Sequence, residues 1–248
     1  MQRKDTSSSL TQAAYERLRN DVLVCRLRPG ERLKINELSA VLSVSPGAIR
    51  EALSRLTSEG LIVASPQRGF FVAPISIEEL RDLTMVRTQI EESCLRSAIA
   101  HGDLAWEAGL VAALHLLNQT PERVVGEPKR LNEAWVEAHA AFHAALVAGC
   151  TSPWLLRLRA QLYAQTERYR RLSVPLARAP RDLRMEHQQL ATVVLARDAD
   201  AAAKLMAQHL NVTMRIIDDG ADLLAGDISA PPESASPRER TIAHDVTA

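Results

Sequence analysis

The sequence of 248 residues is poor in aromatic residues, glycine and proline, and it contains no long apolar run. Phe, Trp and Tyr number three each, and there are only 10 Gly and 12 Pro. β-Sandwiches and barrels depend on aromatic side chains and on many turn residues, so this composition favours helices. No apolar segment approaches the roughly 18 residues that a membrane-spanning helix needs. We therefore expect a mainly helical protein without a membrane span.

Cysteine is also scarce. The three cysteines, Cys25, Cys94 and Cys150, form no Cys-x-x-Cys motif and no disulfide framework. Such unpatterned thiols suit a reducing compartment. The polar segment 1–9 lacks the apolar stretch of a secretory signal. These absences predict a cytoplasmic location.

Charge is balanced overall but not along the chain. Residues 1–73 carry 11 Lys and Arg against 7 Asp and Glu, a net charge of +4, and the remainder carries −4. A basic N-terminal third suggests an anionic polymer bound at that end.

Residues 10–74 show three short amphipathic helices followed by two β-prone runs. Ser45 followed by Pro46 is typical of a helix start, and Gly60 of a helix end. The runs on either side of 66–69 predict a hairpin. Three short helices and a hairpin make a winged helix-turn-helix domain, preceded by a disordered leader over 1–9.

A helix-turn-helix places its second helix in the major groove of DNA, with the first residues of that helix at the base edges. Arg50 lies on the expected outer face, where a guanidinium can bridge guanine O6 and N7. Lys34 and Ser45 are expected to contact phosphates, and Arg68 at the hairpin tip to reach the backbone or minor groove. The alternative for Arg50 is a solvated helix charge. The candidate DNA-binding residues are Lys34, Ser45, Gly47, Arg50, Arg68 and Gly69.

This region resembles a known family. The segment LKINELSAVLSVSPGAIREALSRLTSEGLIVASPQRGFFVAPIS is similar to the DNA-binding domain of the GntR family of bacterial transcription regulators. The resemblance runs from about residue 11 to residue 72 and includes Arg50-Glu51-Ala52-Leu53, Glu59-Gly60-Leu61 and Arg68-Gly69. Asn36 departs from it, because many relatives have a DNA-contacting arginine there. The family implies a dimer that binds a palindromic operator.

Residues 75–225 show only helical periodicity. Six helices are expected at about 77–101, 104–118, 129–149, 152–173, 180–197 and 199–222, without strands. Such an arrangement predicts an all-α bundle of six to seven helices. Residues 226–248, rich in Pro and Ser, are expected to be disordered.

Histidines in this half suggest a metal site. His139 and His143 are four residues apart, hence on one helix face, and His187 and His209 fall on two later helices at positions compatible with an inward face. Four imidazoles in a bundle core would bind a borderline transition metal such as Zn, with Ni, Cu or Fe as alternatives. Spacing alone is a weak signal, since a lone histidine is usually a satisfied core or surface residue.

A second resemblance bears on this site. The segments EAHAAFHAALVAG, MEHQQLATVVLARDADAAAKLMAQHL and MVRTQIEESCLRSAIA look like the FCD effector domain of the FadR subfamily. It implies the metal ligands His139, His143, His187 and His209, most simply for Zn with Ni possible, although an Asp is usual at position 139. It also implies a small carboxylate effector held by the metal and Arg87, with Tyr163 and Arg170 as weaker candidates. The alternative for Arg87 is an ordinary surface pair with Glu91.

The favoured function is a transcription regulator and not an enzyme. We expect a repressor that binds operator DNA as a homodimer and responds to a small carboxylate. One alternative is a metal-free regulator that senses acyl-coenzyme A or another small molecule. A metalloenzyme is disfavoured, because Glu137 and Glu186 each neighbour a predicted ligand in sequence and should turn away from it.

Overall fold

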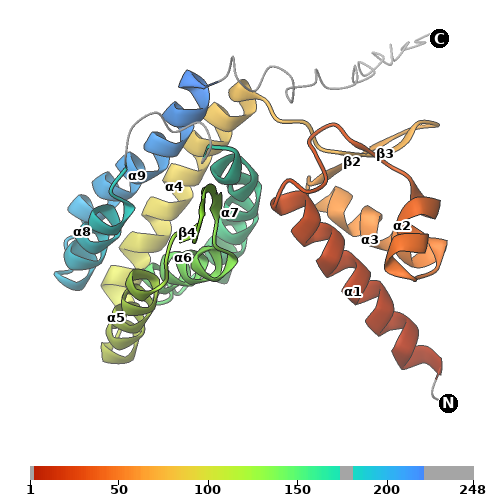
Figure 1. Cartoon of the computed structure of the whole chain (residues 1–248). Helices are drawn as coiled ribbons and strands as arrows, with labels where there is room; N and C mark the ends of the chain where they lie inside the picture. The colour runs from red at the N-terminus through yellow and green to blue at the C-terminus, as the bar shows by residue number, and fades with distance from the viewer. Residues whose placement is uncertain (1–2, 174–180, 221–248) are drawn as a thin grey trace, which may run out of the picture.

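The protein folds into a winged helical part at its N-terminus and a helical bundle (Figure 1). The computed structural model describes residues 3–173 and 181–220, so the tail expected to be disordered, 226–248, lies outside the described residues. The helices are α1 (Arg3–Leu23), α2 (Ile35–Leu42), α3 (Pro46–Ser58), α4 (Ile77–His101), α5 (Leu104–Gln119), α6 (Glu133–Leu146), α7 (Pro153–Ser173), α8 (Leu183–Leu195) and α9 (Ala199–Asp219). The strands are β1 (Arg32–Leu33), β2 (Ile62–Ser65), β3 (Gly69–Val72), β4 (Arg123–Val124) and β5 (Glu127–Leu131).

Helices α1–α3 and a small antiparallel sheet form the predicted winged helix-turn-helix. The hairpin β2–β3 pairs Ile62 with Val72 and Ser65 with Gly69. The strand β1 was not expected; it pairs with β3 and makes the sheet three-stranded, in the order β1-β3-β2. A two-residue strand carries no periodicity of its own and forms only because β3 offers it a free edge. The core is built mainly from buried apolar residues of α1, α3 and the sheet, against which α2 packs only partly buried side chains. The core residues include Leu18, Val22, Leu33, Ile49, Leu53, Leu56, Leu61 and Val72.

Helix α3 begins and ends at the expected signals. The side-chain oxygen of Ser45 accepts a hydrogen bond from the backbone N–H of Ala48, with Pro46 in the first turn. At the other end Gly60 adopts a φ of 74°, a left-handed conformation that glycine favours. The buried stripe consists of Ile49, Ala52, Leu53 and Leu56. Arg50 lies outside this stripe and is exposed to solvent.

The N-terminal helix is longer than predicted. Helix α1 begins at Arg3, so most of the segment 1–9 that we expected to be disordered is helical. The expectation was wrong because polarity was taken as disorder. No Gly or Pro interrupts residues 3–23, and a polar extension of an anchored helix needs no core of its own.

The bundle is organised around α4. This helix packs against α7 and α9, while α5 packs on α6 and α8 (Figure 1). Within the described residues, no helix combines the length and the apolarity needed to cross a membrane. The largest fully buried side chains of the bundle core are Leu95, Leu110, Phe142, Leu146, Leu190 and Met206.

The bundle is not free of strands, contrary to expectation. Strands β4 and β5 form a short hairpin around Gly126, which adopts a φ of 82°. Helix α6 accordingly begins at Glu133 rather than near residue 129, and the side chain of Asn132 accepts a hydrogen bond from Ala134 N–H at its start. The glycine turn and the Asn cap were both visible in the sequence, but the helical periodicity expected to continue through them was given more weight.

Candidate metal centre and DNA-binding surface

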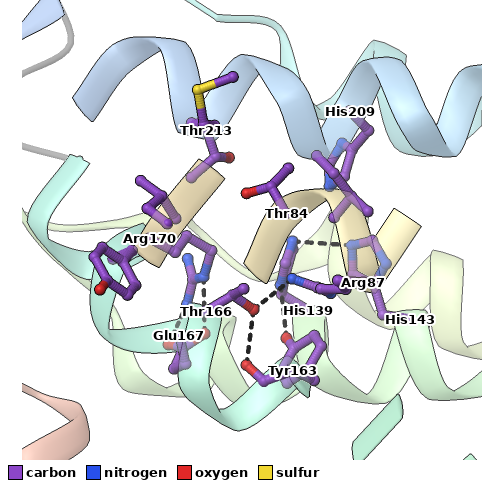
Figure 2. A pocket seen from close by; sticks show the side chains of 14 residues that line it. Thr84, Arg87, His139, His143, Tyr163, Thr166, Glu167, Arg170, His209 and Thr213 are labelled. Atoms are coloured by element: carbon purple, nitrogen blue, oxygen red, sulfur yellow. Dashed lines mark hydrogen bonds and ion pairs between the residues drawn. The ribbon is translucent and has the colours of Figure 1, made fainter. Parts of the chain in front are cut away.

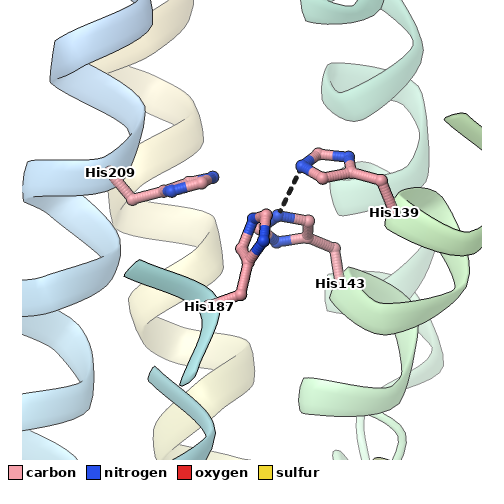
Figure 3. Close-up of side chains that lie close together, drawn as sticks. All are labelled: His139, His143, His187 and His209. Atoms are coloured by element: carbon pink, nitrogen blue, oxygen red, sulfur yellow. Dashed lines mark hydrogen bonds between the residues drawn. The ribbon is translucent and has the colours of Figure 1, made fainter. Parts of the chain in front are cut away.

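Four histidine side chains meet inside the bundle (Figure 3). One ring nitrogen from each of His139, His143, His187 and His209 lies within 4.8 Å of the others. Nε2 of His139 and Nε2 of His143 are 3.2 Å apart, and the ring centroids of His187 and His209 are 5.1 Å apart. The structure thus brings together all four residues predicted as ligands.

Three helices supply these rings. His139 and His143 project from α6 one turn apart, as the four-residue spacing predicts. Phe142, which is fully buried, anchors this face of α6 in the core. His187 comes from α8 and His209 from α9, and all four side chains are buried. The cluster therefore depends on the packing of the bundle and not on a flexible loop.

Two of the rings are oriented from outside the cluster. Oε2 of Glu186 lies 2.8 Å from Nδ1 of His209, and Arg181 holds the same carboxylate at 2.6 Å. The hydroxyl of Tyr163 lies 3.2 Å from Nδ1 of His139. With Nδ1–H donating outward, Nε2 of each ring keeps its lone pair for a metal. Glu186 is adjacent in sequence to His187 but contacts a different histidine, His209 of α9.

The cluster fits a divalent transition metal. Nε2 of His187 and Nδ1 of His143 are buried without a hydrogen-bond partner among the described residues, although buried polar atoms are normally paired. Burial lowers the pKa of all four imidazoles, that of His187 to about 2, so the rings remain neutral and able to ligate. Four neutral nitrogen donors suit Zn, with Ni as the alternative.

These lowered pKa values predict a pH dependence of stability. In the unfolded chain the four imidazoles take up protons below a pH of about 6.5, whereas in the folded protein they resist protonation. The unfolded state then binds more protons, so stability falls as the pH drops. We expect the urea midpoint of EDTA-treated protein to decrease from pH 7.5 to pH 5.5.

The variant His187→Gln should show a weaker decrease than the wild type. His101 is exposed, so His101→Gln serves as the matched control and should keep the wild-type dependence. A midpoint that stays constant, or rises, as the pH falls over this range would contradict the assignment of neutral buried imidazoles.

A pocket adjoins the histidines (Figure 2). It contains about 490 Å³ of space not occupied by atoms, a volume that includes its opening to solvent. Besides three of the histidines, its polar lining includes Thr84, Arg87, Tyr163, Thr166, Glu167, Arg170 and Thr213. The three effector candidates from the sequence, Arg87, Tyr163 and Arg170, therefore all line one pocket beside the cluster.

Arg87 does pair with Glu91, but not as an ordinary surface pair. Both side chains are buried, and their closest N–O distance is 3.3 Å. Glu91 makes a shorter contact, 2.7 Å, with Arg159, which also donates to the backbone oxygen of His143. Glu91 thus has a stronger partner than Arg87. The guanidinium of Arg87 also donates to Thr166 and lies 4.9 Å from the ring centre of Tyr163.

Arg170 is held more firmly. It makes two hydrogen bonds to Glu167, at 2.6 and 2.9 Å, and its guanidinium lies 5.4 Å from the ring centre of Trp135. Its positive charge lowers the pKa of His139, next after burial in effect. Arg170 therefore contributes positive potential to the pocket, while two of its five N–H donors are bonded to Glu167.

The predicted DNA-binding residues lie on the surface of the winged part. Arg50 is exposed on α3, and no contact of its side chain within the described residues competes with DNA. Lys34 is exposed and pairs with Glu37 at 2.7 Å, an ion pair of little strength in water. Ser45 and Gly47 are exposed at the start of α3, and Arg68 and Gly69 at the turn between β2 and β3.

Sequence reasoning missed several residues of the site. Glu186 and Arg181 orient His209, and Arg159 competes with Arg87 for Glu91. The partners His209 and Glu91 lie on other helices. Helical spacing relates residues within one helix only, so it could not pair them. The one available signal was Glu186 next to His187, because a carboxylate beside a predicted ligand is often part of the outer shell.

Comparison with known proteins identifies a family for each half of the chain. Residues 10–72 match the gntR family of bacterial regulatory proteins, and residues 82–212 match the FCD domain. The chain is 39% identical over 209 residues to the HTH-type transcriptional regulator BphR of Paraburkholderia xenovorans, covering 84% of this chain and 85% of that one. It is 38% identical to the HTH-type transcriptional repressor GlaR of Escherichia coli, covering 82% and 93%.

A solved structure shares the fold. The E. coli protein McbR/YncC superposes with a TM-score of 0.69 at 22% identity, covering 86% of this chain and 98% of that one. At this identity the likeness concerns the fold alone. The two family matches and the curated relatives, which are transcription regulators and not enzymes, show the family of the chain. The chain belongs to the GntR family of bacterial transcription regulators and carries an FCD domain.

Proposed function

We propose that this regulator is a repressor whose dimer binds a palindromic operator and responds to a small carboxylate in the pocket beside the four histidines. The observation that carries this proposal is the buried four-histidine cluster opening onto a pocket lined by Arg87. A cluster with unpartnered imidazole nitrogens favours metal binding over a metal-free sensor of acyl-coenzyme A.

A metal held by His139, His143, His187 and His209 would supply positive charge for an anionic oxygen. Because the four imidazoles are neutral, they leave that charge uncompensated, which favours an anionic effector. Glu186 and Tyr163 keep the ring nitrogens of His209 and His139 aimed at the cluster. The chain's own contribution is thus a fixed set of donors and a positive pocket.

Arg87 is suited to bind the carboxylate. Its contacts to Glu91 are 3.3 and 3.4 Å long, at the weak end for a hydrogen bond, and Glu91 remains paired with Arg159 if Arg87 turns away. A guanidinium can then form two parallel hydrogen bonds with a carboxylate. Further polar groups of the effector can meet the hydroxyls of three pocket threonines, Thr84, Thr166 and Thr213.

The winged part would bind the operator DNA. We infer that Arg50 contacts a base edge, while Lys34, Ser45 and Gly47 contact the backbone and Arg68 and Gly69 of the wing reach the minor groove or phosphates. A two-fold symmetric dimer matches a palindromic operator, because each winged part then occupies one half-site.

A thermal-shift screen tests the effector site. Dicarboxylates and sugar acids are added to zinc-loaded and EDTA-treated protein, and at least one acid should raise the melting temperature of the zinc-loaded form only. Arg87→Ala should lose one charge-assisted contact, worth about 1.5–3 kcal/mol, and so weaken that acid about 10- to 150-fold.

Arg96→Ala is the matched control for this variant. Arg96 lies on the same helix, α4, and also pairs with a glutamate four residues away, Glu92, but it is exposed and distant from the pocket lining. The control should bind the acid like the wild type. If Arg87→Ala binds the acid as tightly as the wild type, Arg87 has only a structural role.

A further inference from the structure

Helix α7 touches both the pocket and the DNA-binding half. Tyr163, Thr166, Glu167 and Arg170 line the pocket at the three- and four-residue spacing of one helix face (Figure 2). Gln165 and Arg168 lie between them in the sequence, so their side chains leave the helix on a neighbouring face. That face contacts the winged part of the molecule.

Gln165 contacts the end of the helix that carries Arg50. Its Nε2 donates a hydrogen bond to the backbone oxygen of Glu59, the C-cap of α3. The approach is close, because a Cβ atom at Gly60 would lie 3.1 Å from the same Nε2. The side chain of Glu59 in turn accepts hydrogen bonds from Tyr15 and Arg19 of α1. Gln165 therefore meets the winged part where α1 and α3 are joined.

Arg168 and Tyr169 hold the segment that connects the two parts. Arg168 is 2% exposed and donates to the backbone oxygen of Ala73, directly after β3. The Tyr169 hydroxyl donates to Glu79 at 3.0 Å and lies 3.3 Å from the backbone nitrogen of Ser76. The Tyr169 ring also packs in a small apolar cluster with Ile75 of the connecting segment. Tyr169 itself lines the pocket.

We propose that α7 transmits the occupancy of the pocket to the recognition helix α3, with Gln165 and Arg168 as the positioning residues. The inference rests on the proposed function, because it assumes that the histidine cluster and the pocket bind ligands. A helix moves as a rigid body, so a ligand that shifts Thr166 or Arg170 also shifts Gln165 and Arg168, which lie within one turn of them. Regulation then follows if the ligand favours one placement of α3 over another.

The histidine cluster also contacts α7. Tyr163 of α7 contacts Nδ1 of His139, so a metal that fixes the His139 ring also fixes Tyr163. Zn²⁺ alone is therefore a usable probe of the transmission, without a known effector.

Hydrogen–deuterium exchange of the full-length protein, with and without Zn²⁺, provides the measurement. In the wild type, Zn²⁺ should alter exchange in peptides from α6, α8 and α9 and also in peptides covering residues 46–76. In Gln165→Ala the change over 46–76 should shrink by a factor of about 2 or more, while the zinc affinity stays within about twofold of the wild type. Arg168→Lys, which keeps the charge but loses the planar guanidinium, should behave in the same direction.

Gln161→Ala is the matched control. Gln161 lies one turn earlier on α7 and is exposed, so its loss should leave the full zinc response over residues 46–76. A wild-type response in both Gln165→Ala and Arg168→Lys would overturn the transmission through α7, as would zinc binding without any change over 46–76 in the wild type. If Zn²⁺ binds but exchange over 46–76 does not change in the wild type, only the transmission through α7 fails. If Zn²⁺ does not bind the bundle at all, the proposed function fails as well.

Discussion

One divalent transition-metal ion per chain is expected in the purified protein, and His143→Ala is expected to lose it. His143 lies in the middle of the cluster, 3.2 Å from His139 between ring nitrogens, and it is 1% exposed, so no water-exposed group can replace it. A ligand that binds only the folded state at about 100 times its Kd adds about 2.7 kcal/mol of stability. For a chain of this size, that corresponds to a rise in melting temperature of roughly 5–10 °C.

Elemental analysis and thermal melts with Zn²⁺ and with EDTA check this expectation. The wild type should show the zinc-dependent rise, and His143→Ala should show none. His115→Ala is the matched control, since His115 is exposed on α5 and should leave the metal content unchanged. Protein that contains no metal after purification without chelators, and none after reconstitution, would refute the metal site.

The variant Arg50→Ala should lose about 1–3 kcal/mol of operator binding, which is about 5- to 150-fold in affinity. Arg50 is exposed on α3, outside the buried stripe of Ile49, Ala52, Leu53 and Leu56. A base-reading arginine carries sequence preference, so the variant should also tolerate substitution of one base pair per half-site. Fluorescence anisotropy on a duplex selected from a random pool by the wild type, and on its single-base variants, measures both effects.

Two further variants separate base reading from other roles. Lys34→Ala should weaken all duplexes to the same extent, because a phosphate contact carries no sequence information. Arg55 lies on the same helix but faces α1, where it donates to Gln12 and lies 3.8 Å from the ring centre of Tyr15. Arg55→Ala should therefore keep the sequence preference. If Arg50→Ala retained both affinity and preference, α3 would not be the recognition helix as oriented here.

Local signals explain why the winged part could be predicted from the sequence. Ser45, Pro46 and Gly60 each act on their own backbone neighbours, so their effect does not depend on the rest of the fold. Strand β1 was missed because its two residues are extended only by pairing with β3. The helical extension of α1 before Thr11 was missed because a polar composition was equated with disorder.

The four-histidine cluster was only partly predictable from the sequence. The spacing of His139 and His143 predicted a shared helix face, which the structure confirms. That His187 and His209 join them depends on how three helices pack. Helical periodicity indicated only that each of the two could face inward, and the family resemblance added that all four meet. The contact of Glu186 with His209, 23 residues apart in sequence, had no signal in helical periodicity at all.

A ligand at the four-histidine site should change how tightly the winged part binds DNA. To measure this change, an acid that raises the melting temperature of the zinc-loaded protein is added to zinc-loaded protein bound to the labelled selected duplex. The duplex Kd should change about 5- to 150-fold in the wild type, corresponding to a coupling of about 1–3 kcal/mol, and should stay constant in His143→Ala. An acid that stabilises the zinc-loaded protein but leaves the wild-type duplex Kd unchanged would refute this coupling.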